Sequence, residues 1–195
     1  MHSTLRNHQF LVKEHTGIFK AANNYDIFDP ATGDKTLECR EPNLGLLTKF
    51  FRFTNYKRMT PFDIEIRTPE GVKVLSVTRG LSLLLSKVEV RDENDRLVGQ
   101  FKQKLFSIGG KFDVLDAGGA SVCTLKGNWV GWDFRFVAPS GEIASVSKKW
   151  AGVGKELFTS ADNYMLSISP SVSESDNTRM LILAAVLCID MVLKE

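Results

Sequence analysis

The sequence predicts a mainly β protein, built as a closed antiparallel barrel of about twelve strands around a buried C-terminal α-helix. Three observations lead to this prediction. A unit of two alternating apolar and polar stretches joined by a polar turn occurs five times, one further alternating stretch lies on each side of these repeats, and ten consecutive apolar residues lie close to the C-terminus. With 195 residues, 43% of them hydrophobic and 25% charged, we expect a single domain spanning residues 1–195.

The repeated unit reads as an antiparallel hairpin, because each copy holds two strand-length alternating stretches around a turn. The copies begin at Tyr25, Phe62, Ser86, Gly110 and Trp132. Their turn centres lie near Asp29, Thr68, Asp92, Asp116 and Ala138, and the last four are 22 to 24 residues apart. Five hairpins give ten strands, and the alternating stretches His8–His15 and Asn163–Ser169 raise the prediction to about twelve.

A sheet of this size avoids exposed edges by closing or by splitting into two layers. Side chains fill a barrel of about eight strands, whereas about sixteen or more strands leave a channel. A barrel of about twelve strands therefore needs something bulky in its lumen, and one helix would fit.

The run Met180–Ile189 is the candidate for that helix. Ser175, Asp176 and Asn177 precede it as good N-cap residues, and no polar face interrupts it before Asp190. We expect a core helix at about 177–193, with these residues in or at the end of the lumen: Leu181, Ile182, Val186, Ile189 and Asp190.

The length of this helix argues against a membrane span. From Thr178 to Leu193 it would extend roughly 24 Å, whereas the hydrocarbon core of a bilayer is roughly 30 Å thick. A membrane anchor and an exposed helix that binds a partner remain the alternatives.

Composition and motifs narrow the classes of function. A net charge of +2 gives no reason to expect nucleic acid as a partner. All histidines lie in the first fifteen residues, and nucleotide-binding, hydrolase and metalloprotease motifs are absent from the sequence. We therefore do not expect an enzyme.

The cysteines and the N-terminal residues bear on location. Cys39, Cys123 and Cys188 are widely spaced, which predicts reduced thiols. The first thirty residues contain no signal peptide, so we expect a cytoplasmic protein.

The C-terminal third carries a resemblance to a known family. The stretch "EIASVSKKWAGVGKELFTSADNYMLSIS", followed by "LILAAVLCIDMVLKE", resembles the signature of the phospholipid scramblases, and "FDIEIRTPEGVKVLSVTRGL" is similar to their early hairpin. Relatives of that family include the LURP-one-related proteins and the tubby C-terminal domain. The resemblance runs from about Tyr25 to Glu195 and implies a closed twelve-stranded barrel around a C-terminal helix.

The resemblance also implies a function. It implies a phospholipid-binding protein that mediates bidirectional movement of phospholipids between leaflets, peripheral on the cytoplasmic face of the membrane. The alternative is a soluble lipid- or protein-binding module of the tubby or LURP-one type that does not scramble lipids. The cysteine clusters that are palmitoylated in mammalian scramblases are missing, and the comparable segment reads "RGLSLLLSKVEV". Lipid anchoring through thioesters is therefore not expected.

No cofactor is certain, and calcium is the one candidate that the resemblance suggests. The family's EF-hand-like segment corresponds to Ser160–Ser171, where the candidate ligands are Asp162, Tyr164 and Leu166. Only Asp162 is acidic and no glycine provides the central turn, so the loop is a degraded calcium site. The alternative is a β-strand that points alternate residues into the barrel.

Two basic segments are candidate sites for an anionic phospholipid or membrane surface. The first is a cluster of three lysines around one tryptophan, formed by Lys148, Lys149, Trp150 and Lys155. Its alternative is a solvated turn with the indole packed on the barrel wall. The second is Asn43–Met59, an amphipathic stretch that contains Lys49 and Arg52 and could instead cap one mouth of the barrel.

Overall fold

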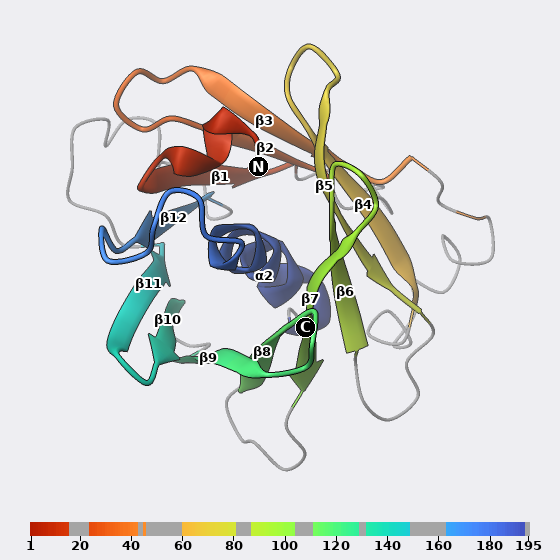
Figure 1. Ribbon diagram of the computed structural model, residues 1–195. Coiled ribbons are helices and arrows are strands. Elements are labelled where there is room, and N and C mark those ends of the chain that lie inside the picture. Colours follow the sequence, from red (N-terminus) through yellow and green to blue (C-terminus); the bar gives the residue numbers. More distant parts are fainter. Residues whose placement is uncertain are drawn as a thin grey trace.

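A computed structural model describes residues 1–15, 24–42, 45, 60–80, 87–103, 111–128, 132–148 and 163–193. Within these residues, twelve strands close into an antiparallel barrel around one α-helix, as the sequence predicts (Figure 1). The first six strands are β1 (Gln9–Glu14), β2 (Tyr25–Phe28), β3 (Lys35–Arg40), β4 (Phe62–Arg67), β5 (Lys73–Arg79) and β6 (Lys87–Asp92). The next six are β7 (Leu97–Gln103), β8 (Phe112–Asp116), β9 (Ser121–Asn128), β10 (Asp133–Ala138), β11 (Gly141–Ser147) and β12 (Asn163–Ile168). A 3-10 helix η1 (Ser3–Arg6) precedes β1, and α2 (Thr178–Leu193) follows β12.

The barrel is a simple meander in which each strand pairs with its neighbours in the chain. β12 pairs with β1 and closes the sheet, so the described strands have no free edge. All five predicted hairpins are present, and the two flanking alternating stretches form β1 and β12. Because the pairing is antiparallel throughout, successive connections alternate between the two ends of the barrel.

One end, which we call the turn end, carries the five tight hairpin turns. It consists of residues 1–8, 29–34, 68–72, 92–96, 116–120, 138–141 and 169–177. In four of these turns a side chain near the first position accepts backbone hydrogen bonds: Asp29 from Ala31 N, Thr68 from Val72 N, Asp92 from Asn94 N and Arg96 N, and Asp116 from Ala120 N. Local side-chain chemistry therefore helps to set where these four hairpins reverse.

The opposite end, which we call the loop end, is where the other six connections between strands begin and finish, and most of them are longer. They join β1 to β2, β3 to β4, β5 to β6, β7 to β8, β9 to β10 and β11 to β12. Much of this chain lies outside the described residues. The described loop-end positions are therefore the strand ends and a few residues next to them.

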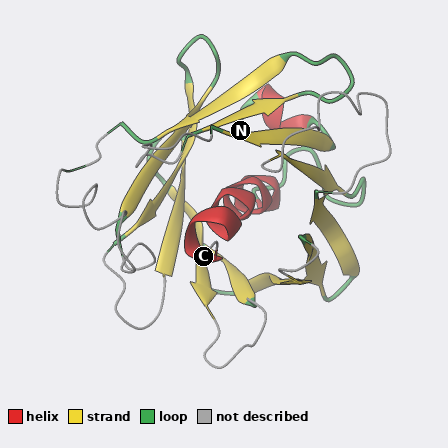
Figure 2. Cartoon of the chain, turned by 180° about the vertical axis from the view of Figure 1, so that it is seen from behind, coloured by secondary structure: helices red, strands yellow, loops and turns green. Residues whose placement is uncertain are grey.

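Helix α2 fills the lumen, which confirms the prediction of a core helix (Figure 2). Every residue from Met180 to Ile189 is at most 6% exposed. A cavity of only about 10 Å³ remains where Ala185, Cys188 and Ile189 face Val88, Phe101 and Phe112. A helix that is apolar all round is stable only when its whole surface is buried, and the barrel wall provides that burial.

The start of α2 is capped as the sequence suggests. Asp176 Oδ1 accepts a hydrogen bond from Thr178 N at 2.8 Å, and Asn177 O accepts from Met180 N at 3.0 Å. The helix begins at the turn end and runs toward the loop end. Asp190 lies within α2, but its side chain is outside the described set. No helix in the described parts of the chain is long and apolar enough to span a membrane.

Candidate functional site

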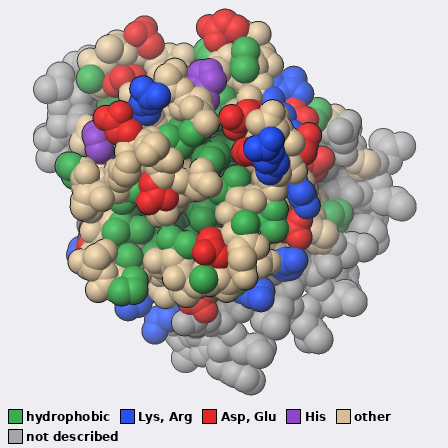
Figure 3. All heavy atoms as spheres, viewed as in Figure 1, with side chains coloured by type: hydrophobic (Ala, Val, Ile, Leu, Met, Phe, Trp, Pro, Cys, Tyr) green, Lys and Arg blue, Asp and Glu red, His purple; other side chains and the backbone are tan. Residues whose placement is uncertain are grey.

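The two ends of the barrel differ strongly in charge. The turn-end segments contain nine acidic residues, namely Asp29, Asp34, Glu70, Asp92, Glu93, Asp95, Asp116, Glu174 and Asp176, against two basic ones, Arg6 and Arg96. Figure 3 views the molecule from this end, and acidic side chains stand around it. Such an end repels an anionic surface.

The segments that join strands at the loop end have the opposite composition. Residues 15–24, 41–61, 80–86, 103–111, 129–132 and 148–162 contain ten lysines and arginines against three acidic residues. They also hold all three tryptophans, whereas the turn-end segments contain no aromatic residue. Basic and aromatic side chains together are the composition that favours a membrane interface.

The described rim of the loop end contains an aromatic cluster built on β10 and β12. Trp132, just before β10, stacks on Tyr164 of β12 with ring centroids 4.8 Å apart, and meets Phe134 edge-on at 5.8 Å. Tyr164 and Phe134 are buried because their strands point alternate residues into the lumen. Trp132 has φ 47, a conformation that bulky residues rarely adopt, so packing holds this indole in place.

Lys148 brings a positive charge to this cluster. It follows β11 on the inward-facing row of Ala144 and Val146, and it is half-buried. Its Nζ lies 4.2 Å from the Trp132 ring centroid and 5.1 Å from that of Tyr164. Cation–π contacts therefore hold the ammonium group at the rim. The sequence-based prediction places Lys148 in a cluster around Trp150. In the described residues, the tryptophan that Lys148 contacts is Trp132.

A second cation lies deeper at the same end. Arg79, at the end of β5, is 4% exposed, donates to Thr60 O at 2.6 Å and has its guanidinium carbon 4.7 Å from the Phe62 ring centroid. Its charge also acts on Cys188: burial raises the pKa of that thiol, and Arg79 opposes the rise. Arg79 therefore places positive charge near the C-terminal half of α2, which suits the helix dipole.

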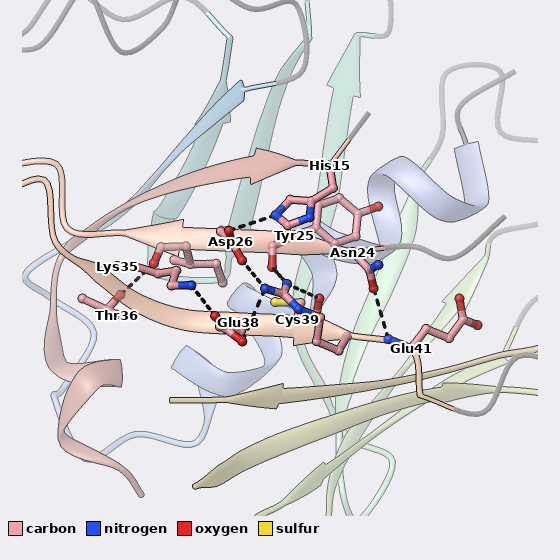
Figure 4. A network of polar contacts seen from close by, with 11 residues as sticks. His15, Asn24, Tyr25, Asp26, Lys35, Thr36, Glu38, Cys39 and Glu41 are labelled. Atoms are coloured by element: carbon pink, nitrogen blue, oxygen red, sulfur yellow. Dashed lines mark hydrogen bonds and ion pairs between the residues drawn. The ribbon is translucent and has the colours of Figure 1, made fainter. Parts of the chain in front are cut away.

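The outer wall beside the loop end carries a self-contained polar network (Figure 4). Arg40 donates to Asp26 at 2.6 Å and to Tyr25 O at 2.7 Å, and His15 Nε2 lies 2.9 Å from Asp26. Burial alone would raise the pKa of Asp26, but hydrogen bonds from Arg40 and His15 outweigh it and lower that pKa. Because these charges already have partners, we assign this network to the wall rather than to ligand binding.

The remaining predicted site residues fall into two groups. Tyr164 and Leu166 lie in β12 with buried side chains, as the strand alternative for the calcium segment predicts. Outside the described residues lie Lys49, Arg52, Lys149, Trp150, Lys155 and Asp162, and with them the candidate segment Asn43–Met59 apart from residue 45. In the described portion no group of three or more His, Cys, Asp or Glu could hold a metal ion. The calcium site stays a prediction.

The cysteines are not exposed for modification. Cys39, Cys123 and Cys188 are all free and buried. Burial raises the pKa of Cys123 to about 12 and also raises those of the other two thiols. Protonated, buried thiols are poor nucleophiles.

Comparisons with known proteins agree with this architecture. The chain matches the Scramblase family over residues 8–195. A protein from Arabidopsis thaliana, known from an X-ray structure, has a similar fold with a TM-score of 0.54 and 14% sequence identity, over 94% of this chain and 90% of that one. Among curated proteins no match is found. Since the family match covers almost the whole chain, the protein belongs to the Scramblase family.

Proposed function

We propose that this protein binds anionic phospholipid surfaces at the cytoplasmic face of a membrane, with the loop end toward the bilayer, and assists movement of phospholipids between leaflets. The observation that supports the proposal is the difference in charge and in tryptophan content between the turn end and the loop end of the barrel. Nine acidic residues stand against two basic ones at the turn end, whereas the loop-end segments hold ten basic residues, three acidic ones and every tryptophan. Family membership supports a lipid-related role.

Lys148 and Trp132 are the described groups that we assign to this surface, and the buried ring of Tyr164 packs against both. The lysine would attract headgroup phosphates, and each lysine near an anionic surface contributes about 1 kcal/mol. Trp132 is half-buried at the rim, where an indole suits the boundary between water and acyl chains. No covalent chemistry is part of the proposal, because lipid movement needs none.

The packing of α2 restricts how such a protein could act. Seven large apolar residues of the helix are buried in the lumen: Met180, Leu181, Ile182, Leu183, Val186, Leu187 and Ile189. Exposing them to water would cost roughly 10–20 kcal/mol. Domains are commonly stable by about 5–15 kcal/mol, so releasing the whole helix amounts to unfolding. We therefore propose that the closed barrel acts on the bilayer from outside.

The same packing favours a second candidate function. A lumen with a cavity of only about 10 Å³ beside α2 offers no room there for an acyl chain. A module that docks on lipid without moving it between leaflets, as in the tubby or LURP-one alternative, would need no such space.

One pair of assays separates these functions. Purified protein is floated with vesicles that do or do not contain phosphatidylserine, and leaflet exchange is followed with a fluorescent lipid and an external quencher, each with calcium and with a chelator. Binding with exchange supports the first function, and binding without exchange supports the docking module. Absence of binding to phosphatidylserine vesicles would contradict both. A calcium requirement for either signal would support the degraded calcium segment as a site.

A further inference from the structure

Arg179, in the first turn of α2, is a fully buried cation held by backbone carbonyls. Its exposure is 0%. The guanidinium donates to Leu5 O at 2.7 Å, to Val172 O at 3.0 Å and to Arg6 O at 3.0 Å, and it also donates to Asn7 O. Three of these four acceptors belong to the N-terminal segment, more than 170 residues away in the chain. One side chain thus ties the two terminal regions together.

The N-terminal segment lies across the turn end beside the start of α2. Leu5 is completely buried and belongs to the hydrophobic core, while the Met1 nitrogen lies 3.4 Å from Glu93 Oε1 at the turn between β6 and β7. β1 and β7 stand on opposite sides of a twelve-stranded barrel. Figure 1 shows η1 near the end of α2 that faces the viewer. We call residues 1–7 the strap.

The strap provides a directional contact to a helix that is otherwise apolar from Met180 to Ile189. Between Thr178 and Ile189, Arg179 is the one charged residue in the sequence, and the run that follows it is apolar. Apolar packing resists removal of the helix but does not fix it to one partner. Hydrogen bonds from a buried guanidinium are directional, and losing their acceptors leaves an uncompensated buried charge.

The outer side of the strap is open to other molecules. Arg6, Asn7, His8, Asp29 and Pro170 are among the residues that line a groove of about 510 Å³. Arg6 is exposed there, although its carbonyl accepts from Arg179. The segment can therefore be contacted from outside while it holds the helix from inside.

We propose that the strap is a detachable lock, in which the carbonyls of Leu5, Arg6 and Asn7 hold Arg179 and thereby control whether the N-terminal turns of α2 can open separately from the barrel wall. With the strap in place, α2 opens only when the whole barrel unfolds. With the strap displaced, the N-terminal turns of α2 open in a local step, while the rest of the helix stays packed and the wall stays folded. Arg179 is the positioning residue of this lock. The proposal does not depend on lipid binding.

Amide hydrogen exchange resolved along the chain tests the lock. Helical turns that leave the wall are not stable on their own in water, so the amides of the opened N-terminal turns of α2 exchange. The first variant is Arg179→Lys, which keeps the positive charge but replaces the planar guanidinium and its several N–H donors by an ammonium group. The second variant is a chain that lacks residues 1–7. Arg135→Lys, at an exposed position on β10, is the matched control. Each variant is first checked by circular dichroism for the native β signal.

The expected result is selective acceleration. Amides of Leu181–Leu187 exchange about ten-fold faster or more in Arg179→Lys and in the shortened chain, whereas amides of β6 and β7 change far less. Arg135→Lys leaves both regions unchanged. Equal acceleration of helix and wall would show that Arg179 only adds global stability and would overturn the proposal. Unchanged exchange in α2 would overturn it as well.

Discussion

Gly99 of β7 lies so close to Leu181 of α2 that no side chain fits between them. A Cβ placed on Gly99 would lie 2.9 Å from Leu181 Cδ2 and 2.2 Å from Leu115 O. The helix therefore lies against the wall at a position where the wall has no side chain.

We expect Gly99→Ala to destabilise the fold by about 3 kcal/mol, because a methyl group there must displace either the backbone of β8 or the helix. The free energy of unfolding in urea measures this effect. Gly80→Ala is the control, since a Cβ at Gly80 meets nothing within 4 Å. Equal stability of the two variants would mean that α2 does not pack on Gly99.

Gly127 of β9 makes room for the ring of Phe134 in the same way. The two residues are cross-strand partners, and a Cβ on Gly127 would lie 1.9 Å from Phe134 Cδ1. We expect Gly127→Ala to cost about 2 kcal/mol by displacing the ring from Trp132. Combining it with Phe134→Leu, which shortens the side chain, should cost less than the sum of the two single changes. Additive costs in the urea experiment would rule out this contact.

Asp26 should make the stability depend on pH. Its pKa is lowered from the ordinary 3.8, so its contribution is present above that value and disappears as the pH falls through the lower native pKa. We expect Asp26→Asn to cost about 1 kcal/mol at pH 7, and the difference from the wild type to shrink below pH 3.8.

Urea midpoints between pH 7 and pH 2.5 measure this difference. Asp133→Asn, on the exposed part of β10, is the control and should change little. A gap between wild type and Asp26→Asn that persists at the lowest pH would contradict an ionic role for Asp26.

Lys148 should contribute to vesicle binding through its charge. Lys148→Met keeps most of the side-chain stem over Trp132 and removes the ammonium, so we expect binding to phosphatidylserine vesicles to weaken about five-fold. Arg96→Met, at an exposed position of the turn end, is the matched control for net charge. If both changes weaken binding equally, the effect comes from overall charge and not from the loop end.

The fold was predictable because its signals are local. Alternation marks each strand, and residues such as Asp92 and Asp116 mark the turns by accepting nearby backbone hydrogen bonds. The helix followed from counting strands, since Met180–Ile189 had no other place to bury a surface that is apolar all round. Neither step needed contacts between distant residues.

The contacts of Arg179 with the strap and the aromatic cluster at the loop end were not predictable from strand alternation and turn residues. Arg179 binds carbonyls of Leu5, Arg6 and Asn7, and backbone carbonyls leave no trace in a sequence. The pairing of Lys148 with Trp132 joins residues sixteen apart across the β10–β11 hairpin. One signal was present: the inward alternation of Ala144 and Val146, continued by two residues, points Lys148 toward the lumen.

The orientation of the barrel on a membrane is the most direct test of the account. An environment-sensitive fluorophore is attached at Gly80→Cys, on the loop end, or at Ser171→Cys, on the turn end, while the native cysteines stay buried. Vesicles that contain phosphatidylserine and a nitroxide-labelled lipid are then added. We predict strong quenching at position 80 and little at position 171. Stronger quenching at position 171, or equal quenching at both, would contradict the claim that the loop end faces the membrane.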